Sequence, residues 1–106
     1  MAIASIEIGR ASQMQASSIN GRCIVQEQLA VATGVTNTTA ALSSSEPGLV
    51  ARIATDDTGC YVAIGTTPDP TATADTAATT ARRFLPAAAS IELPFGGGLK
   101  VAVRGL

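Results

Sequence analysis

The sequence contains no histidine and no tryptophan, and its charged residues make up only 14% of 106 residues. Without histidine the chain has no Ser-His-Asp triad, no imidazole general base and no imidazole metal ligand. Seven basic and eight acidic residues give a net charge of −1. Because so small a charge leaves little repulsion between copies, it favours a subunit that works in an assembly.

Other absences exclude further classes of function. The basic residues are scattered, with Arg82-Arg83 as their one adjacent pair, so no basic face for nucleic acid is expected. No apolar run approaches the roughly 20 residues of a membrane span. The first residues alternate like a strand and lack a basic start followed by an apolar core, so we expect no cleavable signal. The predicted partners therefore include neither nucleic acid nor a membrane.

The chain length predicts a single domain, residues 1–106, since most domains have roughly 100–150 residues. Apolar residues make up 46% of the chain, yet the aromatic residues are only Tyr61, Phe84 and Phe95. The core must therefore be built mainly from Ala, Val, Ile and Leu.

The strongest regularity is a period of two, which is typical of half-buried strands. No segment has a convincing helical stripe. The alternating apolar positions are Ile6 and Ile8; Cys23, Val25, Leu29 and Val31; Leu49, Ala51 and Ile53; Cys60, Val62 and Ile64; Ala89, Ile91, Leu93 and Phe95; and Leu99, Val101 and Val103. This pattern predicts an all-β chain, a small antiparallel β-sandwich or barrel of six to eight strands.

Turn residues separate these segments. Asp56–Gly59 predicts a hairpin turn in which Gly59 takes a positive φ, and Gly96–Gly98 separates the last two strands in the same way. Asn20-Gly21 is another turn dipeptide, and Pro47-Gly48 ends a serine-rich loop.

Two long stretches rich in Thr, Ala and Ser are predicted as loops or arms: Thr33–Pro47 and Thr66–Ala81. Loops of this length are uncommon in compact domains and are usually functional. Threonine-rich runs can also pair as strands where an edge is available. A helix over 72–83 is the alternative suggested by its alanines, but its threonines oppose it.

The two cysteines, Cys23 and Cys60, lie on the more apolar faces of their strands. Buried thiols are the favoured interpretation, because free cysteine behaves as a small apolar side chain. A disulfide between facing strands stays open, since sequence parity does not place the sulfur atoms. Metal binding by two cysteines without histidine or clustered acids is disfavoured, and we expect neither metal nor cofactor.

The tripeptide Asp57-Thr58-Gly59, in an all-β chain of this length, resembles the retroviral-type aspartic proteases. That resemblance implies a homodimer in which each chain supplies one carboxylate, Asp57, so that two acids share a proton and activate water. The family has apolar residues before its aspartate, whereas Ala54–Asp56 stand there in this chain. The favoured interpretation is an acidic turn, and we predict no catalytic residue.

Three further motifs have ordinary interpretations. Glu27 interrupts an apolar strand face, as a solvated edge position or as half of an intersubunit ion pair with an arginine such as Arg22 or Arg52. Asn37–Thr39 fits a glycosylation acceptor, but without a secretory signal we do not expect it to be glycosylated. The run Gly96–Gly98 lacks the spacing of a phosphate-binding loop.

Residues 49–103 resemble small virion proteins of tailed bacteriophages, of a type often encoded near the major capsid gene. The segments that carry the resemblance are LVARIAT at 49–55, CYVAIGT at 60–66, FLPA at 84–87, IEL at 91–93 and LKVAV at 99–103. Such chains often have Ala-Gly where Ala87–Ala89 stand here.

The resemblance implies a non-enzymatic structural role in the virion, assembled in the bacterial host cytoplasm. A capsid decoration (cement) protein is favoured over a neck or tail component. Its partners would be the major capsid protein or other virion proteins, together with copies of itself, with a trimer favoured. Segments such as Ala2–Gly9 and Thr66–Ala81 could add to a neighbour's sheet, and assembly would cover the mixed faces with Ile24, Val50 and Tyr61. The alternative of another class is a ligand- or carbohydrate-binding β-sandwich.

Overall fold

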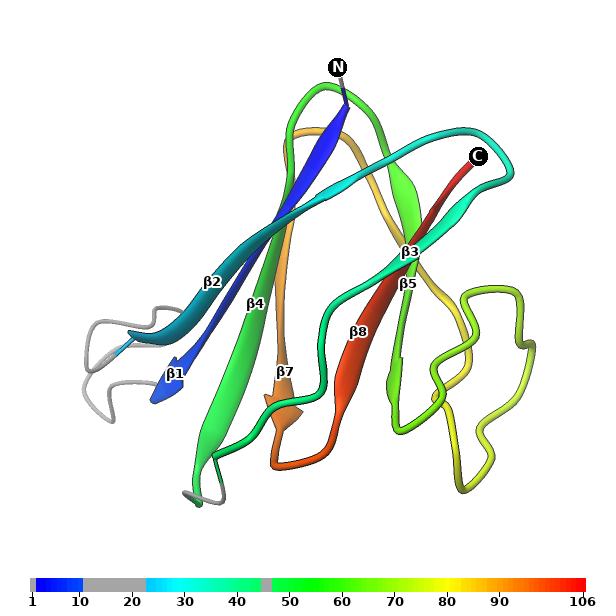
Figure 1. The fold of residues 1–106 in the computed structure, drawn as a ribbon. Helices are drawn as coiled ribbons and strands as arrows, with labels where there is room; N and C mark the ends of the chain where they lie inside the picture. The colour runs from blue at the N-terminus through cyan, green and yellow to red at the C-terminus, as the bar shows by residue number, and fades with distance from the viewer. Residues whose placement is uncertain (1, 11–22, 45–46) are drawn as a thin grey trace.

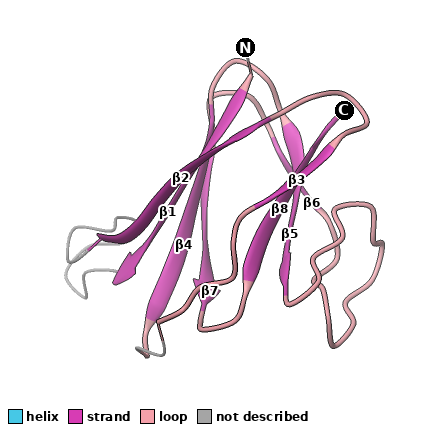
Figure 2. Ribbon diagram, in the orientation of Figure 1, coloured by secondary structure: helices cyan, strands magenta, loops and turns pink. Residues whose placement is uncertain are grey.

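The computed structural model describes residues 2–10, 23–44 and 47–106, and its regular elements are all strands (Figures 1 and 2). Eight strands form two four-stranded antiparallel sheets that face each other. The prediction of an all-β sandwich of six to eight strands is confirmed. None of the described segments forms a helix long and apolar enough to cross a membrane.

Each sheet takes strands from both halves of the chain. Sheet 1 has the order β2-β1-β4-β7, formed by β2 (Cys23–Ala30), β1 (Ile3–Arg10), β4 (Leu49–Thr55) and β7 (Ser90–Phe95). Sheet 2 has the order β3-β8-β5-β6, formed by β3 (Thr36–Thr38), β8 (Lys100–Gly105), β5 (Cys60–Gly65) and β6 (Arg83–Leu85).

The strand pairs are nested along the chain. β5 pairs with β6, β4 with β7, and β3 with β8, while β2 pairs with β1. This is the strand order of a jelly roll, a sandwich of two four-stranded sheets. One strand differs from a jelly roll in its place along the chain. The position between β2 and β4 is occupied here by β1, which begins the chain, whereas in a jelly roll the last strand, which would follow β8, occupies it.

The core lies between the two sheets and is built as the alternation predicts. Successive side chains of a strand point to opposite faces, so every second residue enters the core. The largest fully buried aliphatic side chains are Ile6, Ile53, Val62, Val101 and Val103. Leu29, Leu49 and Phe95 complete its rim.

The predicted hairpin turns at Asp56–Gly59 and Gly96–Gly98 are wrong. The first connects β4 to β5 and the second connects β7 to β8, and in both cases the two strands lie in different sheets. Turn residues signal that the chain reverses, but they do not decide whether the next strand pairs with the last one. Asn20-Gly21 lies outside the described residues.

The first long stretch supplies the edge of sheet 2. It contains β3, and beyond it the N–H groups of Thr39 and Leu42 donate to the carbonyls of Val101 and Leu99 at 2.9 and 3.1 Å. The threonine-rich run therefore pairs as an edge, and the strand that accepts it is the chain's own β8.

The second long stretch, Thr66–Ala81, folds back as a loop on the outer side of sheet 2 (Figure 1). The N–H of Thr80 donates to the carbonyl of Ile64 at 2.8 Å, and Pro70 is fully buried. The outward-facing Ala63 and Ala102 of the sheet are buried as well. The segment is neither a helix nor an extended arm, because Thr80 near its end is hydrogen-bonded to Ile64 of β5, the strand that directly precedes it.

The expectation that Ala2–Gly9 adds to a neighbour's sheet is also wrong. β1 pairs with β2 on one side and with β4 on the other, so both of its edges are occupied. The register shifts between Ile8 and Gly9, and Ile24 beside that shift packs partly against the chain's own core.

Candidate functional site

Four side chains from four strands form a row across the outer face of sheet 2. The register pairs Thr36 of β3 with Arg104 of β8, Arg104 with Tyr61 of β5, and Tyr61 with Phe84 of β6. All four positions have the same parity in their strands, and side chains of one parity share a face. Sheet register therefore brings together residues that are up to 68 positions apart in the chain.

The aromatic end of this row is held by ring contacts. Tyr61 and Phe84 meet edge to face, with ring centroids 5.9 Å apart and ring planes at 65°. The guanidinium of Arg82 lies over the Tyr61 ring, 4.5 Å from its centroid. Edge-to-face pairs and cation–π contacts are both attractive at such separations. The three side chains are thus held in place by one another.

The basic end of the row is also anchored. Arg104 donates from Nη1 to Oγ1 of Thr36 at 3.1 Å. The pKa of Asp69, in the loop that covers sheet 2, is lowered by hydrogen bonds from the hydroxyl and N–H of Thr71 and by the charge of Arg104. Arg104 is therefore tied to Thr36 and lies near enough to Asp69 for its charge to lower the pKa of that carboxyl.

A glycine makes room for the exposed ring. A β-carbon on Gly59 would stand 3.3 Å from two ring carbons of Phe84 and 3.0 Å from the carbonyl oxygen of Leu85. The positive φ predicted for Gly59 is wrong, since its φ is not in the left-handed region. A β-carbon at this position would be tightly placed, and the Phe84 ring and the backbone of β6 would have to move by a few tenths of an ångström to accept it.

The row includes or adjoins the exposed large apolar side chains of the described residues. The exposed large apolar side chains among them are Val35, Phe84 and Leu106, at 47%, 53% and 55%. Val35 directly precedes β3 and Leu106 directly follows β8, at the end of sheet 2 where Thr36 pairs with Arg104. We call Tyr61, Arg82, Phe84 and Arg104, with Val35 and Leu106 beside them, the sheet-2 patch.

The composition of the sheet-2 patch is that of a protein interface. Tyrosine, phenylalanine and arginine are enriched at the centres of interfaces, where they combine large contact area with directed hydrogen bonds. The sequence signals for it were the outward parity of Tyr61 and the basic pair Arg82-Arg83. Sequence reasoning missed their contact because β5 and β6 are joined by a long loop that gives no register.

Cys60 is a buried, free thiol in β5, which confirms the prediction of a buried side chain at this position. Burial raises the pKa of the Cys60 thiol to about 11, so it stays protonated at neutral pH. The predicted alternative of a disulfide is therefore not formed at Cys60. The side chain of Cys23 lies outside the described residues.

Asp57 is exposed in the connection between β4 and β5, where Oγ1 of Thr58 donates to it at 3.3 Å. Its neighbour Asp56 has the structural role, since Oδ2 accepts the N–H of Ile3 at 3.0 Å. Desolvation raises the pKa of Asp56, but hydrogen bonds from the N–H groups of Ile3 and Asp57 outweigh it and lower the pKa. The acidic turn thus ties the start of β1 to the end of β4.

Glu27 is half-buried on the inner face of β2, opposite Ile6. Arg52, one of its two predicted ion-pair partners, lies on the outer face and contacts Glu7 instead, with Nη1 3.1 Å from Oε1. Arg22, the other, lies outside the described residues. The prediction that Glu27 interrupts the apolar face of its strand is thus confirmed, and β2 is an edge strand of sheet 1.

The remaining motifs have structural roles. Nδ2 of Asn37 donates to the carbonyl of Ala30 at 2.7 Å, linking β3 to β2. Gly98 takes φ 81° in the connection between β7 and β8. In the part of the chain that the structure describes, no group of three or more Cys, Asp or Glu side chains is placed to hold a metal ion.

No protein-family model matches the chain, and no curated protein or solved structure is similar to it.

Proposed function

We propose that this chain is a non-enzymatic structural subunit of a tailed-bacteriophage virion, most specifically a capsid decoration (cement) protein. The observation that carries its role as a binding subunit is the sheet-2 patch, where Val35, Phe84 and Leu106 are exposed beside two anchored arginines. The virion class comes from the resemblance of residues 49–103. The jelly-roll strand order, which viral capsid proteins share with lectins, is compatible with it by analogy of fold alone.

The patch suits a contact that must be stable without covalent links. Burying an apolar side chain fully contributes roughly 1.5–3 kcal/mol. The ring and guanidinium contacts of Tyr61 already hold Arg82 and Phe84, so less side-chain entropy is lost on binding. Arg82 and Arg104 would pair with acidic or carbonyl groups of the neighbour. Decoration of the head shell would use this surface across capsomer boundaries, and a neck or tail position would use it in the same way.

The test is incorporation into particles assembled from the capsid proteins of the same genome. Phe84→Ser removes the most exposed ring of the patch, while Arg83→Ala, on the neighbouring exposed position, is the matched control. We expect the wild type and Arg83→Ala to co-sediment with particles at a fixed stoichiometry and Phe84→Ser to bind at least 10-fold more weakly. Equal occupancy by Phe84→Ser, or no binding by the wild type, would contradict the proposal.

Native mass at micromolar concentration, with and without reductant, tests self-association separately. We expect a trimer, and in a Cys23→Ser background we expect reductant not to change it, because Cys60 is buried and free. A stable dimer would instead favour the protease hypothesis, and Asp57→Asn would then have to abolish cleavage of an unfolded substrate.

A carbohydrate-binding role is the second candidate, and the exposed Phe84 ring is the feature that favours it. Sugars stack on aromatic faces, but the partner ring, Tyr61, is covered by Arg82. A glycan array on which the wild type binds and Phe84→Ser does not would replace the virion proposal.

A further inference from the structure

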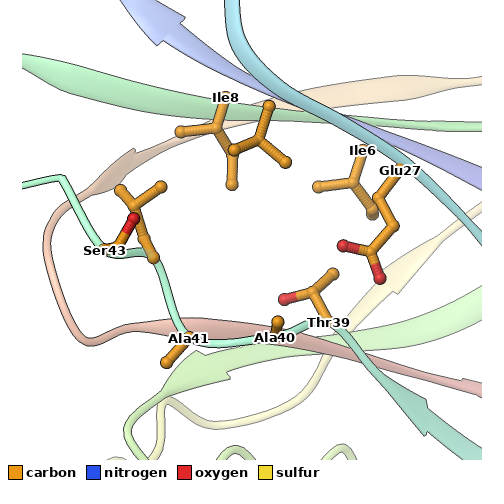
Figure 3. Close-up of a pocket in the computed structure, with 9 residues that line it drawn as sticks. Ile6, Ile8, Glu27, Thr39, Ala40, Ala41 and Ser43 are labelled. Carbon is orange, nitrogen blue, oxygen red and sulfur yellow. The ribbon is translucent and has the colours of Figure 1, made fainter.

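The side of the sandwich between β2 and the segment 39–43 contains a cavity of about 80 Å³ (Figure 3). β1 and β2 form one of its walls, and the edge segment of sheet 2 forms the other. The lining residues are Ile6, Ile8, Val25, Glu27, Thr39, Ala40, Ala41, Leu42 and Ser43. We call this space the Glu27 cavity, after its one ionisable side chain.

The cavity is polar at one end and apolar along its length. Figure 3 shows the Glu27 carboxylate beside Thr39, with Ser43 at the far end and Ile8 along the wall. The Thr39 hydroxyl is fixed because its oxygen accepts the N–H of Val101 at 3.0 Å. A ligand in this space would therefore lie against aliphatic groups with a carboxylate at one end.

Glu27 has no hydrogen-bond or ion-pair partner among the described residues. Neither oxygen of Glu27 is among the buried side-chain atoms without a partner, so the carboxylate is open to solvent and can be reached by a cation. The other acidic residues of sheet 1 lie on its outer face, where Glu7 has Arg52 beside it. The described residues thus place one negative charge at the cavity and pair no basic side chain with it.

We propose that the Glu27 cavity receives the side chain of a lysine presented by a partner protein. The inner-face row of Ile8 and Val25 is followed, two residues along the strands, by the row of Ile6 and Glu27. Successive rows are roughly 6.5–7 Å apart, a distance that four methylene groups can span. The methylenes would lie against Ile8 and Val25, and the ammonium would pair with the carboxylate.

Lysine fits this site better than arginine does. An ammonium is a compact charge with three donors, whereas a guanidinium is a wide planar group with five donors that need several acceptors. The cavity offers one carboxylate. Its volume of about 80 Å³ is small even when compared with a cavity of roughly 150 Å³ that binds benzene. The inference depends neither on the sheet-2 patch nor on the virion role.

The test is an NMR titration with n-butylammonium chloride, the side chain of lysine without its backbone, at constant ionic strength. We expect saturable shifts of the Ile6 and Ile8 methyl signals, with millimolar affinity at least 10-fold tighter than that of n-butanol. Glu27→Gln should lose that 10-fold preference. Glu92→Gln removes the same charge from the outer face of sheet 1, opposite Arg52 in the register, and should bind as the wild type does.

Three outcomes would overturn the assignment. Equal affinity for n-butanol would mean an apolar void without charge selection, and tighter binding of n-propylguanidinium would mean an arginine site. Absence of saturable shifts in the wild type would mean that the cavity receives no cation. Phe84→Ser, which changes the sheet-2 patch alone, should bind n-butylammonium normally, so failure of this inference and failure of the proposed function are distinguishable.

Discussion

The backbone of Gly65 lies directly beneath the carbonyl of Ala78, so close that a β-carbon on Gly65 would overlap that oxygen. Gly65 ends β5 and Ala78 belongs to the loop that returns over sheet 2. The N–H of Thr67 donates to the same carbonyl at 3.0 Å, which holds the loop in this position. A single missing side chain therefore permits the long loop to close on its own sheet.

Replacing Gly65 by alanine should destabilise the fold by about 1–3 kcal/mol, the usual cost of overpacking. The β-carbon would clash with backbone atoms of Ala78 and Thr79, which cannot rotate away as a flexible side chain would. Gly96→Ala is the control, because a β-carbon there meets nothing within 4 Å. Urea unfolding of both variants measures the difference, and equal midpoints would show that the loop does not pack as described.

Replacing Thr79 by valine should destabilise the chain by about 1–3 kcal/mol, because it leaves a backbone donor unsatisfied. The buried Thr79 hydroxyl accepts the N–H of Asp69 at 2.8 Å and donates to the carbonyl of Thr80 at 2.9 Å. Thr79→Ser keeps the hydroxyl and should lose much less. A thermal melt in which valine is as stable as serine would argue against these hydrogen bonds.

Replacing Ala88 by glycine should raise stability by a few tenths to about 1 kcal/mol. Ala88 has φ 54°, a left-handed conformation that costs a residue with a β-carbon about 1–2 kcal/mol. Glycine regains that cost and loses about 0.4–1 kcal/mol through the greater freedom of the unfolded chain. Ala87→Gly carries only that loss, because Ala87 is not at positive φ. Chemical denaturation should therefore order the chains as Ala88→Gly, wild type, Ala87→Gly.

The Cys60 thiol should resist alkylation in the folded protein and react fully in denaturant, measured in a Cys23→Ser background. Burial raises its folded pKa to about 11 from an ordinary value of 9.0. Because the folded thiol has the higher pKa, the free energy of unfolding is unaffected by this group below pH 9. It falls by about 1.4 kcal/mol per pH unit as the pH rises from 9 toward 11. The unfolding free energy of Cys60→Ala should not show this fall between pH 9 and pH 11. Rapid labelling of native protein at pH 8 would contradict the burial.

The strand faces were predictable from the sequence because they depend on local geometry. Each strand turns alternate side chains to opposite sides, so Ile53, Val62 and Val103 could be assigned to the core without knowing any neighbour. The inward parity of Glu27 followed from the same alternation. Pairing across the sheets was not predictable, and β3 and β6, at three residues each, are too short to show a period.

The sequence by itself determined an all-β chain, the faces of its main strands and an aliphatic core, since a period of two needs only local contacts. The tertiary structure decided which strands share a sheet, and so made Asp56–Gly59 and Gly96–Gly98 connections between sheets. It also placed Arg82 over Tyr61 and opened a cavity beside Glu27. Both sites depend on register and packing between segments far apart in the chain, which a local pattern does not encode.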